Sequence, residues 1–469
     1  MTDSRNKYLL KNTTIFAIGN FATKLISFFL IPLYTNALTT SEYGTVDLVT
    51  TISTIAVPIL TLNIGEAVMR FNLDRDVDRD GITKIGMSVL LMGMLAGSVL
   101  IPLSNLFVPA SGLAPLIYFY VLFSATSQVF LCDLRGKEML VQYSIGNVLN
   151  TLLIVAFNIL FLLVFKLGIK GYLLAYTMAF AIVTIYALVV GKGYRAIKTA
   201  FDSEKARAML RYSIVLIPNS FMWWIMNSSD HIMVTSMVGV AANGIYAISY
   251  KLPTLITTIT QIFTQAWSYS AIREEGAADE AEYNNRVFRV MIAVVMITGI
   301  CMMAVIKPFL KIYVSPEYYS AWQYTPFLTV GCAFLTLASF MSTSYTVHKD
   351  SLGFLFSGLM GALLNVVLNF LLIPVIQAYG AALATCVSYI VVFVFRLFHT
   401  RKYLRYEVMT KEFIVGVALL LVTGCLMFVD SIVAQIAQGI LAAIAIVSFR
   451  NAWLPIVRAF RWKRQGKET

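Results

Sequence analysis

Arg211 to Leu252 reads RYSIVLIPNSFMWWIMNSSDHIMVTSMVGVAANGIYAISYKL, two apolar segments joined by a short turn of Gly, Ala and Asn. Each segment is long enough to cross a bilayer, yet each carries polar residues that lipid would reject. On the first, the residues at helical spacing that share one face are Asn219, Trp223, Asn227 and Asp230. On the second, which continues beyond Leu252, they are Tyr250, Thr254, Thr257, Gln261 and Thr264. Two membrane helices with one polar face each predict a polar cavity between them.

The composition of the whole chain is that of a membrane protein. Of its 469 residues, 59% are hydrophobic and 13% are charged, and the mean hydropathy is +0.77. Apolar runs of about 18 residues or more recur along the whole length, and no polar stretch is long enough to build a soluble core. We therefore expect an all-α membrane protein. The five cysteines show no paired spacing and are expected to be free thiols.

The apolar runs predict about fourteen transmembrane helices, with boundaries good to about two to four residues. They are placed at 12–36, 44–64, 85–108, 114–132, 144–165, 170–190, 213–237, 244–268, 289–307, 324–347, 354–376, 379–398, 413–429 and 431–448. Thirty of the 36 Lys and Arg residues then fall on one side of the membrane and four on the other. The positive-inside rule assigns the richer side, and both termini, to the cytoplasm. This loop bias accounts for the net charge of +12 without nucleic-acid binding.

The two halves of the chain resemble each other. IGNVLNTLLIVAFN, which begins at Ile145, resembles MGALLNVVLNFLLIP, which begins at Met360, and KGYLLAYT from Lys170 resembles YGAALATC from Tyr379. Six helices per half is an even number, so the halves are parallel repeats. We expect an N-terminal lobe at 1–200, a C-terminal lobe at 201–400, and two extra helices with a basic cytoplasmic tail at 401–469. The tail residues Arg458 to Lys467 are expected to contact anionic lipid heads.

The segment FSGLMGALLNVVLNFLLIPVIQAYGAALATCVSYIVVFVFR, from Phe356 to Arg396, carries a family resemblance. Its N-x3-N-x2-LIP and GAALAT patterns resemble the Wzx-type polysaccharide-biosynthesis flippases of the multidrug/oligosaccharidyl-lipid/polysaccharide exporter superfamily. The start of the chain and the corner MNSSDHIMV…GVAANGIYAISYKL agree with that family, although the family more often has Arg or Lys where His231 stands. The resemblance covers about residues 8 to 400.

The resemblance implies a V-shaped, two-lobed, multi-pass transporter of the cell inner (plasma) membrane that works by alternating access. Its substrate would be a polyprenyl-pyrophosphate-linked oligosaccharide, such as an O-antigen unit for lipopolysaccharide, passed from the cytoplasmic to the outer leaflet. The head group would occupy the polar cavity while the polyprenyl tail stays in lipid. Polysaccharide polymerase machinery is an expected partner. The chain has no Walker A phosphate-binding loop of its own, so an H+ or Na+ gradient, or removal of product outside, would drive transport.

Lys24 is the first candidate for substrate binding. It lies about twelve residues into the first helix, near mid-bilayer at about 1.5 Å per residue, and shares a face with Asn20. A lysine at this depth costs at least about 2.5 kcal/mol if it faces lipid, so we expect it to face the cavity. It would bind the pyrophosphate or acidic sugars, or else pair with Asp47 or Asp230.

The other candidates lie at the two ends of the expected cavity. Asp47 is predicted to line its outer part. Asp230 is read as a site of protonation or cation coupling, or as a cap on the polar wall, and His231 as a packed or solvated residue. Lys251 can snorkel outward or bind substrate, and Trp223 can stack on a sugar or pack in the core.

At the inner end of the second helix, Glu66 and Arg70 are spaced i, i+4. They are read either as a surface ion pair or as an inner gate in which Arg70 contacts phosphate.

Two other classes of protein remain open. A drug/cation antiporter would share the architecture, but it would need an acidic, aromatic cavity, whereas Lys24, Lys251 and Arg70 favour an anionic substrate. A membrane glycosyltransferase or polymerase would need an outer catalytic domain, and no outer loop is long enough for one. We therefore expect a transporter, not an enzyme, with no cofactor or metal.

Overall fold

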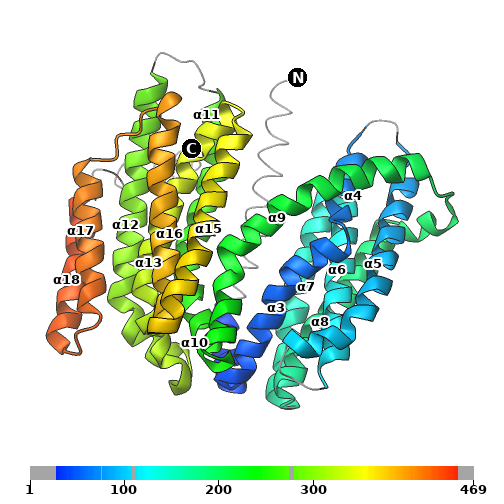
Figure 1. Cartoon of the computed structure of the whole chain (residues 1–469), viewed down its shortest axis with the longest axis horizontal. Helices are drawn as coiled ribbons and strands as arrows, with labels where there is room; N and C mark the ends of the chain where they lie inside the picture. The colour runs from blue at the N-terminus through cyan, green and yellow to red at the C-terminus, as the bar shows by residue number, and fades with distance from the viewer. Residues whose placement is uncertain (1–27, 75–76, 108–111, 274–278, 451, 453–469) are drawn as a thin grey trace, which may run out of the picture. The chain divides into compact units, whose positions relative to one another are not determined.

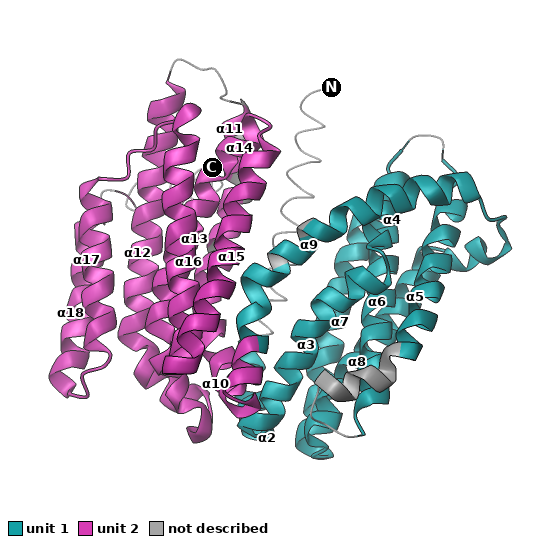
Figure 2. Ribbon diagram, in the orientation of Figure 1, with its two compact units in different colours: residues 1–232 teal, residues 233–469 magenta. Residues whose placement is uncertain are grey.

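The computed structural model describes residues 28–74, 77–107, 112–273, 279–450 and 452. Within them every regular element is helical (Figure 1). The chain divides into two compact units, Met1–Ile232 and Met233–Thr469, called unit 1 and unit 2 (Figure 2). Among the described residues, nine helices are long and apolar enough to cross a membrane. The prediction of an all-α membrane protein is confirmed.

Unit 1 is built around α6 (Ala114–Gly136). The helices that pack against it are α3 (Thr40–Leu60), α4 (Ile64–Asn72), α5 (Arg79–Phe107), α7 (Leu140–Asn158) and α8 (Gly168–Val190). The remaining elements are α2 (Ile31–Ala37), the π-helical turn η1 (Ile159–Val164), the 3-10 helix η2 (Gly193–Lys198) and most of α9 (Ser203–Met237). Ile64, Val68, Ile82 and Ile85 are fully buried in its core.

Unit 2 has α13 (Thr325–Met341) at its centre. The helices packed against it include α10 (Val240–Lys251), α11 (Pro253–Arg273), α12 (Glu280–Tyr313), α16 (Ala378–His399) and α17 (Lys411–Leu426). The others are η3 (Pro316–Gln323), α14 (Thr343–Val347), α15 (Ser351–Ile376), η4 (Thr400–Lys402) and α18 (Ile432–Ser448). Both α17 and α18 pack against α12.

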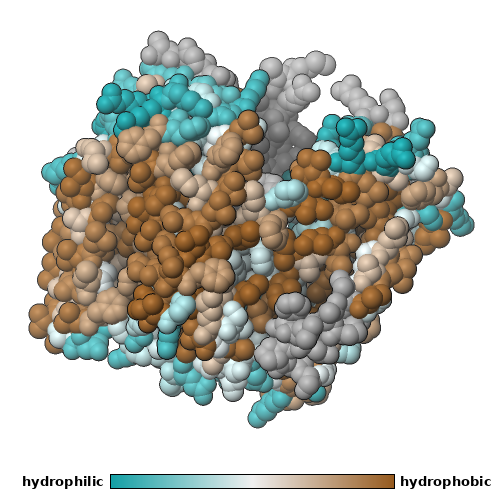
Figure 3. All heavy atoms as spheres, viewed as in Figure 1, coloured by the Kyte–Doolittle hydropathy of each residue, from teal (hydrophilic) through white to brown (hydrophobic). Residues whose placement is uncertain are grey.

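The surface of the helices is suited to lipid. In Figure 3 apolar side chains cover the middle of the helices, and hydrophilic residues gather near the helix ends. On α15, for example, Leu363, Val367, Phe370 and Leu371 are all more than half exposed. Exposed apolar surface on this scale would be unfavourable in water, whereas the hydrocarbon core of a bilayer solvates it.

Each predicted helix after the first has a counterpart in the structure, but the boundaries differ in two ways. The helices predicted at 213–237 and 289–307 begin earlier, at Ser203 and Glu280, because hydropathy marks only the apolar part of a helix. The helix predicted at 44–64 ends at Leu60 and is followed from Ile64 by a separate helix, α4, and the helix predicted at 244–268 is divided in two. Most of the first predicted helix and the basic tail at 458–467 lie outside the described residues, so the count of fourteen and the side of the termini stay predictions.

The break between α3 and α4 has a local cause. Pro58 lies near the end of α3 and lacks the N–H that would continue the helical hydrogen bonds. Leu62 and Asn63 then adopt the left-handed conformation, with φ of 49° and 53°, and the Asn63 N–H donates to the Pro58 carbonyl at 2.7 Å. In the other divided helix, Pro253 begins α11. Discontinuous membrane helices of this kind are typical of transporters.

The end of α3 lies directly against α5 at Gly93. A Cβ atom built on Gly93 would lie 2.0 Å from the Leu60 carbonyl oxygen. We expect Gly93→Ala to destabilise the protein by about 1–3 kcal/mol or more, because backbone atoms must move apart. Gly97→Ala is the matched control, because its Cβ would meet only side-chain atoms at 3.5 Å or more. Thermal unfolding in detergent measures both, and equal unfolding temperatures would refute this account of Gly93.

Candidate functional site

Two aspartates and a histidine lie together inside unit 1. Asp47 is in the second turn of α3, and Asp230 and His231 are adjacent on α9. His231 Nδ1 lies 2.7 Å from Asp47 Oδ2, and His231 Nε2 lies 4.0 Å from Asp230 Oδ1. The three residues are 8%, 3% and 8% exposed. We call these residues the Asp–His cluster.

Two hydrogen bonds hold His231 in this cluster. Nδ1 of His231 and Oδ2 of Asp47 share one of them, and an ionised Asp47 would accept it from the ring N–H. The backbone N–H of His231 donates to Asp230 Oδ1 at 3.0 Å. Two acids and an imidazole in an apolar surrounding are costly unless they share protons or cations.

A second contact holds the same two helices together. The Trp224 indole N–H on α9 donates to the Thr51 carbonyl of α3 at 2.8 Å. Thr51 is one turn along α3 from Asp47, and Trp224 is two turns along α9 from His231. This contact sets the register in which His231 meets Asp47.

Other polar side chains of α3 are bonded within their own helix. Thr50 Oγ1 donates to the Asp47 carbonyl at 2.9 Å, and Thr54 Oγ1 donates to the Thr51 carbonyl at 2.7 Å. A threonine hydroxyl bonded in this way keeps its acceptor lone pairs available. These residues make this face of α3 polar, and neither hydroxyl is left as an unsatisfied hydrogen-bond donor.

The structure places the predicted site residues in different environments. Asn20 and Lys24 lie outside the described residues, and Asn219 and Trp223 are on α9 without described side chains. Asn227 is exposed. In unit 2, Lys251 and Gln261 are exposed, and the Tyr250 hydroxyl lies 2.9 Å from the Tyr389 hydroxyl. Of the predicted residues, the structure brings together Asp47 and Asp230, and it joins them through His231.

Of the two alternatives for Glu66 and Arg70, the surface ion pair between them is wrong. Arg70 is exposed and pairs with Asp74 instead, with 2.5 Å between Nη1 and Oδ1. Asp74 follows α4, where the chain turns, and the i, i+4 spacing is the same in both directions along the helix. Glu66, in the first turn of α4, is half-buried.

A buried ion pair in unit 1 was not anticipated from the sequence. Asp133 and Lys137 on the last turn of α6 lie 2.6 Å apart, with side chains 2% and 7% exposed. Asp133 Oδ1 also accepts from Asn72 Nδ2 at 2.9 Å and from Thr83 Oγ1 at 2.7 Å. The i, i+4 spacing was visible, but only the fold shows that α4 and α5 cover the pair. We call it the Asp133–Lys137 pair.

Unit 2 buries two cations, Arg396 near the end of α16 and Lys307 near the end of α12. Arg396 is 3% exposed and donates to the Ser357 hydroxyl at 3.0 Å and the Ala338 carbonyl at 2.8 Å. Lys307 lies 3.8 Å from the centre of the Trp322 ring and 2.7 Å from Asp430 Oδ1. The hydrogen bond from Lys307 holds the pKa of Asp430 below its usual range. Both cations hold helices together within unit 2, and their contacts are made by the protein's own groups without a bound substrate.

Among the described residues, no group of three or more His, Cys, Asp or Glu side chains could hold a metal ion. Within this part of the chain, the Asp–His cluster is thus the arrangement with the clearest capacity for chemistry. Its buried carboxylates and imidazole lie on α3 and α9, in a fold that contains many apolar helices. Polar groups placed at such a cost in a membrane protein mark a path for a substrate, an ion or a proton.

Together the fold and the cluster define a polytopic membrane protein with ionisable side chains buried among its helices. A comparison with family models matches residues 9–269 to the family described as polysaccharide biosynthesis protein. The match covers more than half of the chain, which therefore belongs to the polysaccharide biosynthesis protein family.

Solved structures share the fold. A lipid II flippase MurJ superposes with a TM-score of 0.73 at 12% identity, covering 95% of this chain and 100% of that one. A multidrug resistance MATE family transporter of the MOP superfamily gives a TM-score of 0.65 at 12% identity, covering 87% and 98%. A MOP superfamily transporter from Pyrococcus furiosus gives 0.52 at 12% identity, covering 88% and 93%. The predicted class of fold, with the Wzx-type resemblance, is confirmed.

A curated relative agrees with the assignment to the membrane. An uncharacterised membrane protein of Methanocaldococcus jannaschii is 25% identical over 305 residues. The aligned part is 60% of this chain and 57% of that protein, so the chain spans little more than half the length of this relative.

Proposed function

We propose that the protein is a flippase for a polyprenyl-pyrophosphate-linked oligosaccharide. It moves the substrate from the cytoplasmic to the outer leaflet of the plasma membrane for surface polysaccharide synthesis. The observation that carries the proposal is the buried Asp–His cluster on membrane helices of a chain from the polysaccharide biosynthesis family. Sugars and phosphates cannot cross lipid unaided, because they would have to lose their water.

We infer that transport is coupled to protons at the Asp–His cluster. A proton taken up by the cluster goes first to the His231 imidazole, which is more basic than a carboxylate, and the imidazolium is attracted by Asp47 and Asp230; release of that proton weakens the contact between α3 and α9. A proton gradient would thereby bias the two helices between two arrangements. In this proposal residues 1–200 and 201–400 form the two lobes that alternate access, 401–469 add two helices, and polysaccharide polymerase machinery receives the product.

A drug/cation antiporter is the second candidate. The observation that favours it is the pair of buried carboxylates, Asp47 and Asp230, because an acidic site suits a cationic substrate. The fold it shares with MATE transporters agrees with this candidate. An enzyme of glycan assembly is the third candidate, and sugar transfer by the purified protein would establish it.

Purified protein in vesicles distinguishes these functions. Vesicles are loaded with a fluorescent polyprenyl-pyrophosphate-linked oligosaccharide in both leaflets, and an impermeant reagent quenches the outer leaflet. We expect nearly complete quenching with the protein and about half without it, faster under an imposed proton gradient. A half-quenched signal combined with ethidium efflux would instead establish the antiporter, and sugar transfer without translocation would establish an enzyme.

A further inference from the structure

The connection between α8 and α9 contains the 3-10 helix η2, which is fixed to the rest of unit 1 along one face. Residues three apart in a 3-10 helix lie above one another, so Gly193 and Ala196 share a face, and both are buried. A Cβ atom on Gly193 would lie 3.4 Å from the Phe130 ring of α6. Lys84 of α5 donates to the Ile197 carbonyl at 3.1 Å. These contacts give η2 a defined orientation on unit 1.

The other two faces of η2 are open, and they differ in chemistry. Tyr194 and Ile197 are three residues apart and are 49% and 61% exposed. Arg195 and Lys198 have the same spacing and are also exposed. Neither of these two cations forms an ion pair with a described residue. An apolar stripe therefore lies beside a basic stripe on the same short helix.

The residues on either side of η2 continue this pattern. Lys192 precedes the helix and is exposed, and Phe201 follows it and is 52% exposed. The nearest acids serve α9 instead: the Asp202 carboxylate accepts a backbone N–H of that helix at 3.0 Å, and Glu204 lies in its first turn, which favours negative charge. We call residues 192–201 the η2 segment.

The position of the η2 segment brings it to a membrane surface. It begins two residues after Val190, where α8, a helix able to span a membrane, ends. Apolar and aromatic side chains at this level can enter the edge of the hydrocarbon region, while Arg and Lys extend to the lipid head groups. Residues 192–211 contain six Lys and Arg, so the positive-inside rule predicts the cytoplasmic side. The leaflet on that side is the one that carries anionic lipids.

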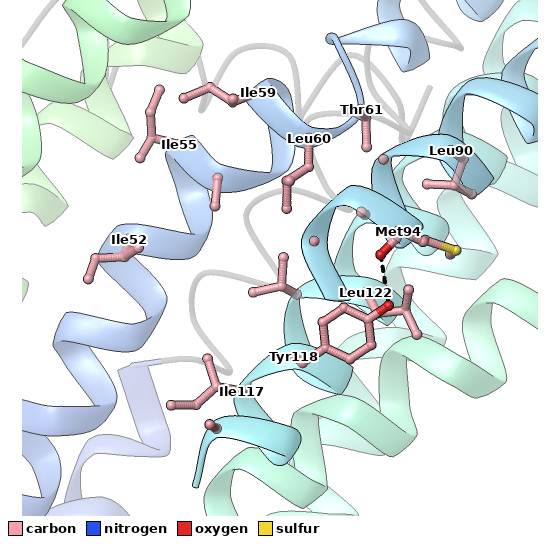
Figure 4. Close-up of a pocket in the computed structure, with 16 residues that line it drawn as sticks. Ile52, Ile55, Ile59, Leu60, Thr61, Leu90, Met94, Ile117, Tyr118 and Leu122 are labelled. Atoms are coloured by element: carbon pink, nitrogen blue, oxygen red, sulfur yellow. Dashed lines mark hydrogen bonds between the residues drawn. The ribbon is translucent and has the colours of Figure 1, made fainter. Parts of the chain in front are cut away.

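The large cavity of unit 1 has a different chemistry. It lies between α3, α5 and α6 and has a volume of about 420 Å³ (Figure 4). None of the described residues that line it is charged. Its two hydroxyl groups already donate to backbone carbonyls, Tyr118 to Met94 at 2.9 Å and Thr61 to Val57 at 2.8 Å. The cavity therefore offers nothing to the phosphate of a lipid head, in contrast to the η2 segment.

We propose that the η2 segment binds anionic phospholipids of the bilayer. Arg195 and Lys198 contact the phosphate groups, and the acyl chains lie against Tyr194 and Ile197. The bound lipid holds the start of α9, the helix that carries two residues of the Asp–His cluster, at the membrane surface. The site goes beyond the proposed transport function and does not depend on it.

Photo-crosslinking tests the proposal. The protein is placed in nanodiscs of phosphatidylcholine that contain a low fraction of a probe, either phosphatidylglycerol or phosphatidylcholine with a diazirine at the start of one acyl chain. Labelled peptides are mapped by mass spectrometry. Each cation near an anionic lipid contributes a factor of about five, so the phosphatidylglycerol probe should label the η2 segment about tenfold or more strongly than the phosphatidylcholine probe. Added salt should reduce this preference.

Variants without the two cations give the matched comparison. Arg195→Gln with Lys198→Gln should lower the preference about tenfold or more, to nearly equal labelling by the two probes. Arg286→Gln with Arg289→Gln removes the same charge from exposed arginines of α12 that already have acidic partners, and it should leave the preference unchanged. If the first double variant does not fold, Lys198→Gln alone should lower the preference about fivefold.

A third pair of substitutions tests the apolar stripe. Tyr194→Ser with Ile197→Ser removes the side chains that lie against the acyl chains, so labelling of the η2 segment by both probes should fall at least about fivefold.

The contrary results are equally definite. Equal labelling of the η2 segment by the two probes, absence of labelling there, or a preference that survives removal of the two cations would overturn the proposal. So would a preference that soluble glycerol phosphate abolishes, because the site would then be one for free phosphates and not for bilayer lipid.

Discussion

Asp47→Asn is expected to stop translocation while leaving the protein folded. The amide keeps the size of the side chain and an oxygen that can accept from His231 Nδ1. It cannot ionise, so the Asp–His cluster loses its charge-assisted hydrogen bond and one of its sites for a proton. Such a bond is worth about 1.5–3 kcal/mol, and about 1.4 kcal/mol corresponds to a tenfold change. Translocation should therefore fall at least about tenfold.

The measurement is the quenching assay with the fluorescent lipid-linked oligosaccharide, repeated across a series of pH values. Wild-type protein should show a pH-dependent rate, and Asp47→Asn should show a low rate with little dependence on pH. Thr54→Val is the matched control, since Thr54 is exposed on the same helix and its hydroxyl bonds only to its own helix in the contacts described. It should behave as wild type.

The variant also distinguishes a role of the Asp–His cluster in transport from a purely structural role. If Asp47→Asn translocated at the wild-type rate with the wild-type pH profile, the contact with His231 would only hold α3 to α9. Unfolding temperature in detergent provides the second readout. An Asp47→Asn protein that unfolds at the wild-type temperature yet fails to translocate would confirm that the carboxylate acts in transport.

Asp133→Ala should cost about 3–5 kcal/mol of stability, the range for breaking a buried ion pair from one side. The substitution leaves the Lys137 ammonium buried and bonded only to the Gly191 carbonyl, at 3.0 Å, among its described contacts. It also removes the acceptor of the Asn72 amide, whereas the Thr83 hydroxyl can still donate to the Arg79 carbonyl at 2.9 Å. The substitution affects three helices at once, because α4, α5 and α6 all contribute to the Asp133–Lys137 pair.

An exposed pair of the same spacing provides the comparison. Arg286 and Glu282 on α12 lie 2.7 Å apart with side chains 70% and 75% exposed. Glu282→Ala should cost no more than about 1 kcal/mol, because water solvates the partner that remains. Unfolding temperature and the amount of protein in the membrane measure both effects. Similar losses for Asp133→Ala and Glu282→Ala would contradict the assignment.

The double variant Asp133→Leu with Lys137→Met tests whether the buried lysine, left without its partner, causes the loss of stability. It removes both charges and fills the space with apolar atoms, so most of the stability lost in Asp133→Ala should return. No recovery would indicate that the hydrogen bonds from Asn72 and Thr83, not the uncompensated lysine, dominate the cost.

Much of the architecture could be predicted from the sequence, because a bilayer imposes strong rules on each segment separately. A run of about 20 apolar residues must form a helix there, since no water is available to bond its backbone. Hydropathy alone therefore placed helices near α5 to α8 and α12 to α18. It did not anticipate that the chain breaks after Leu60 and continues as α4, because Leu62 and Asn63 take left-handed angles that no hydropathy pattern marks.

The candidate site, like the architecture, could be predicted only in part from the sequence. Helical spacing was enough to mark Asp47 and Asp230 as residues that lipid would reject, since burial cost depends on residue type and depth. It could not show that His231 joins them, because Asp47 and His231 are 184 residues apart in the chain. Nor could it show that Arg70 pairs with Asp74, or that Asp133 and Lys137 are covered by α4 and α5.

What the sequence determined by itself is therefore the class of each segment: membrane helix, connection or polar face. These depend on the free energy of transferring one segment from water to lipid. What only the tertiary structure decided is which polar groups meet and where space is left, including the Asp–His cluster and the apolar cavity beside α3. Those depend on how helices distant in the chain pack, and packing is a property of pairs of surfaces that no single segment contains.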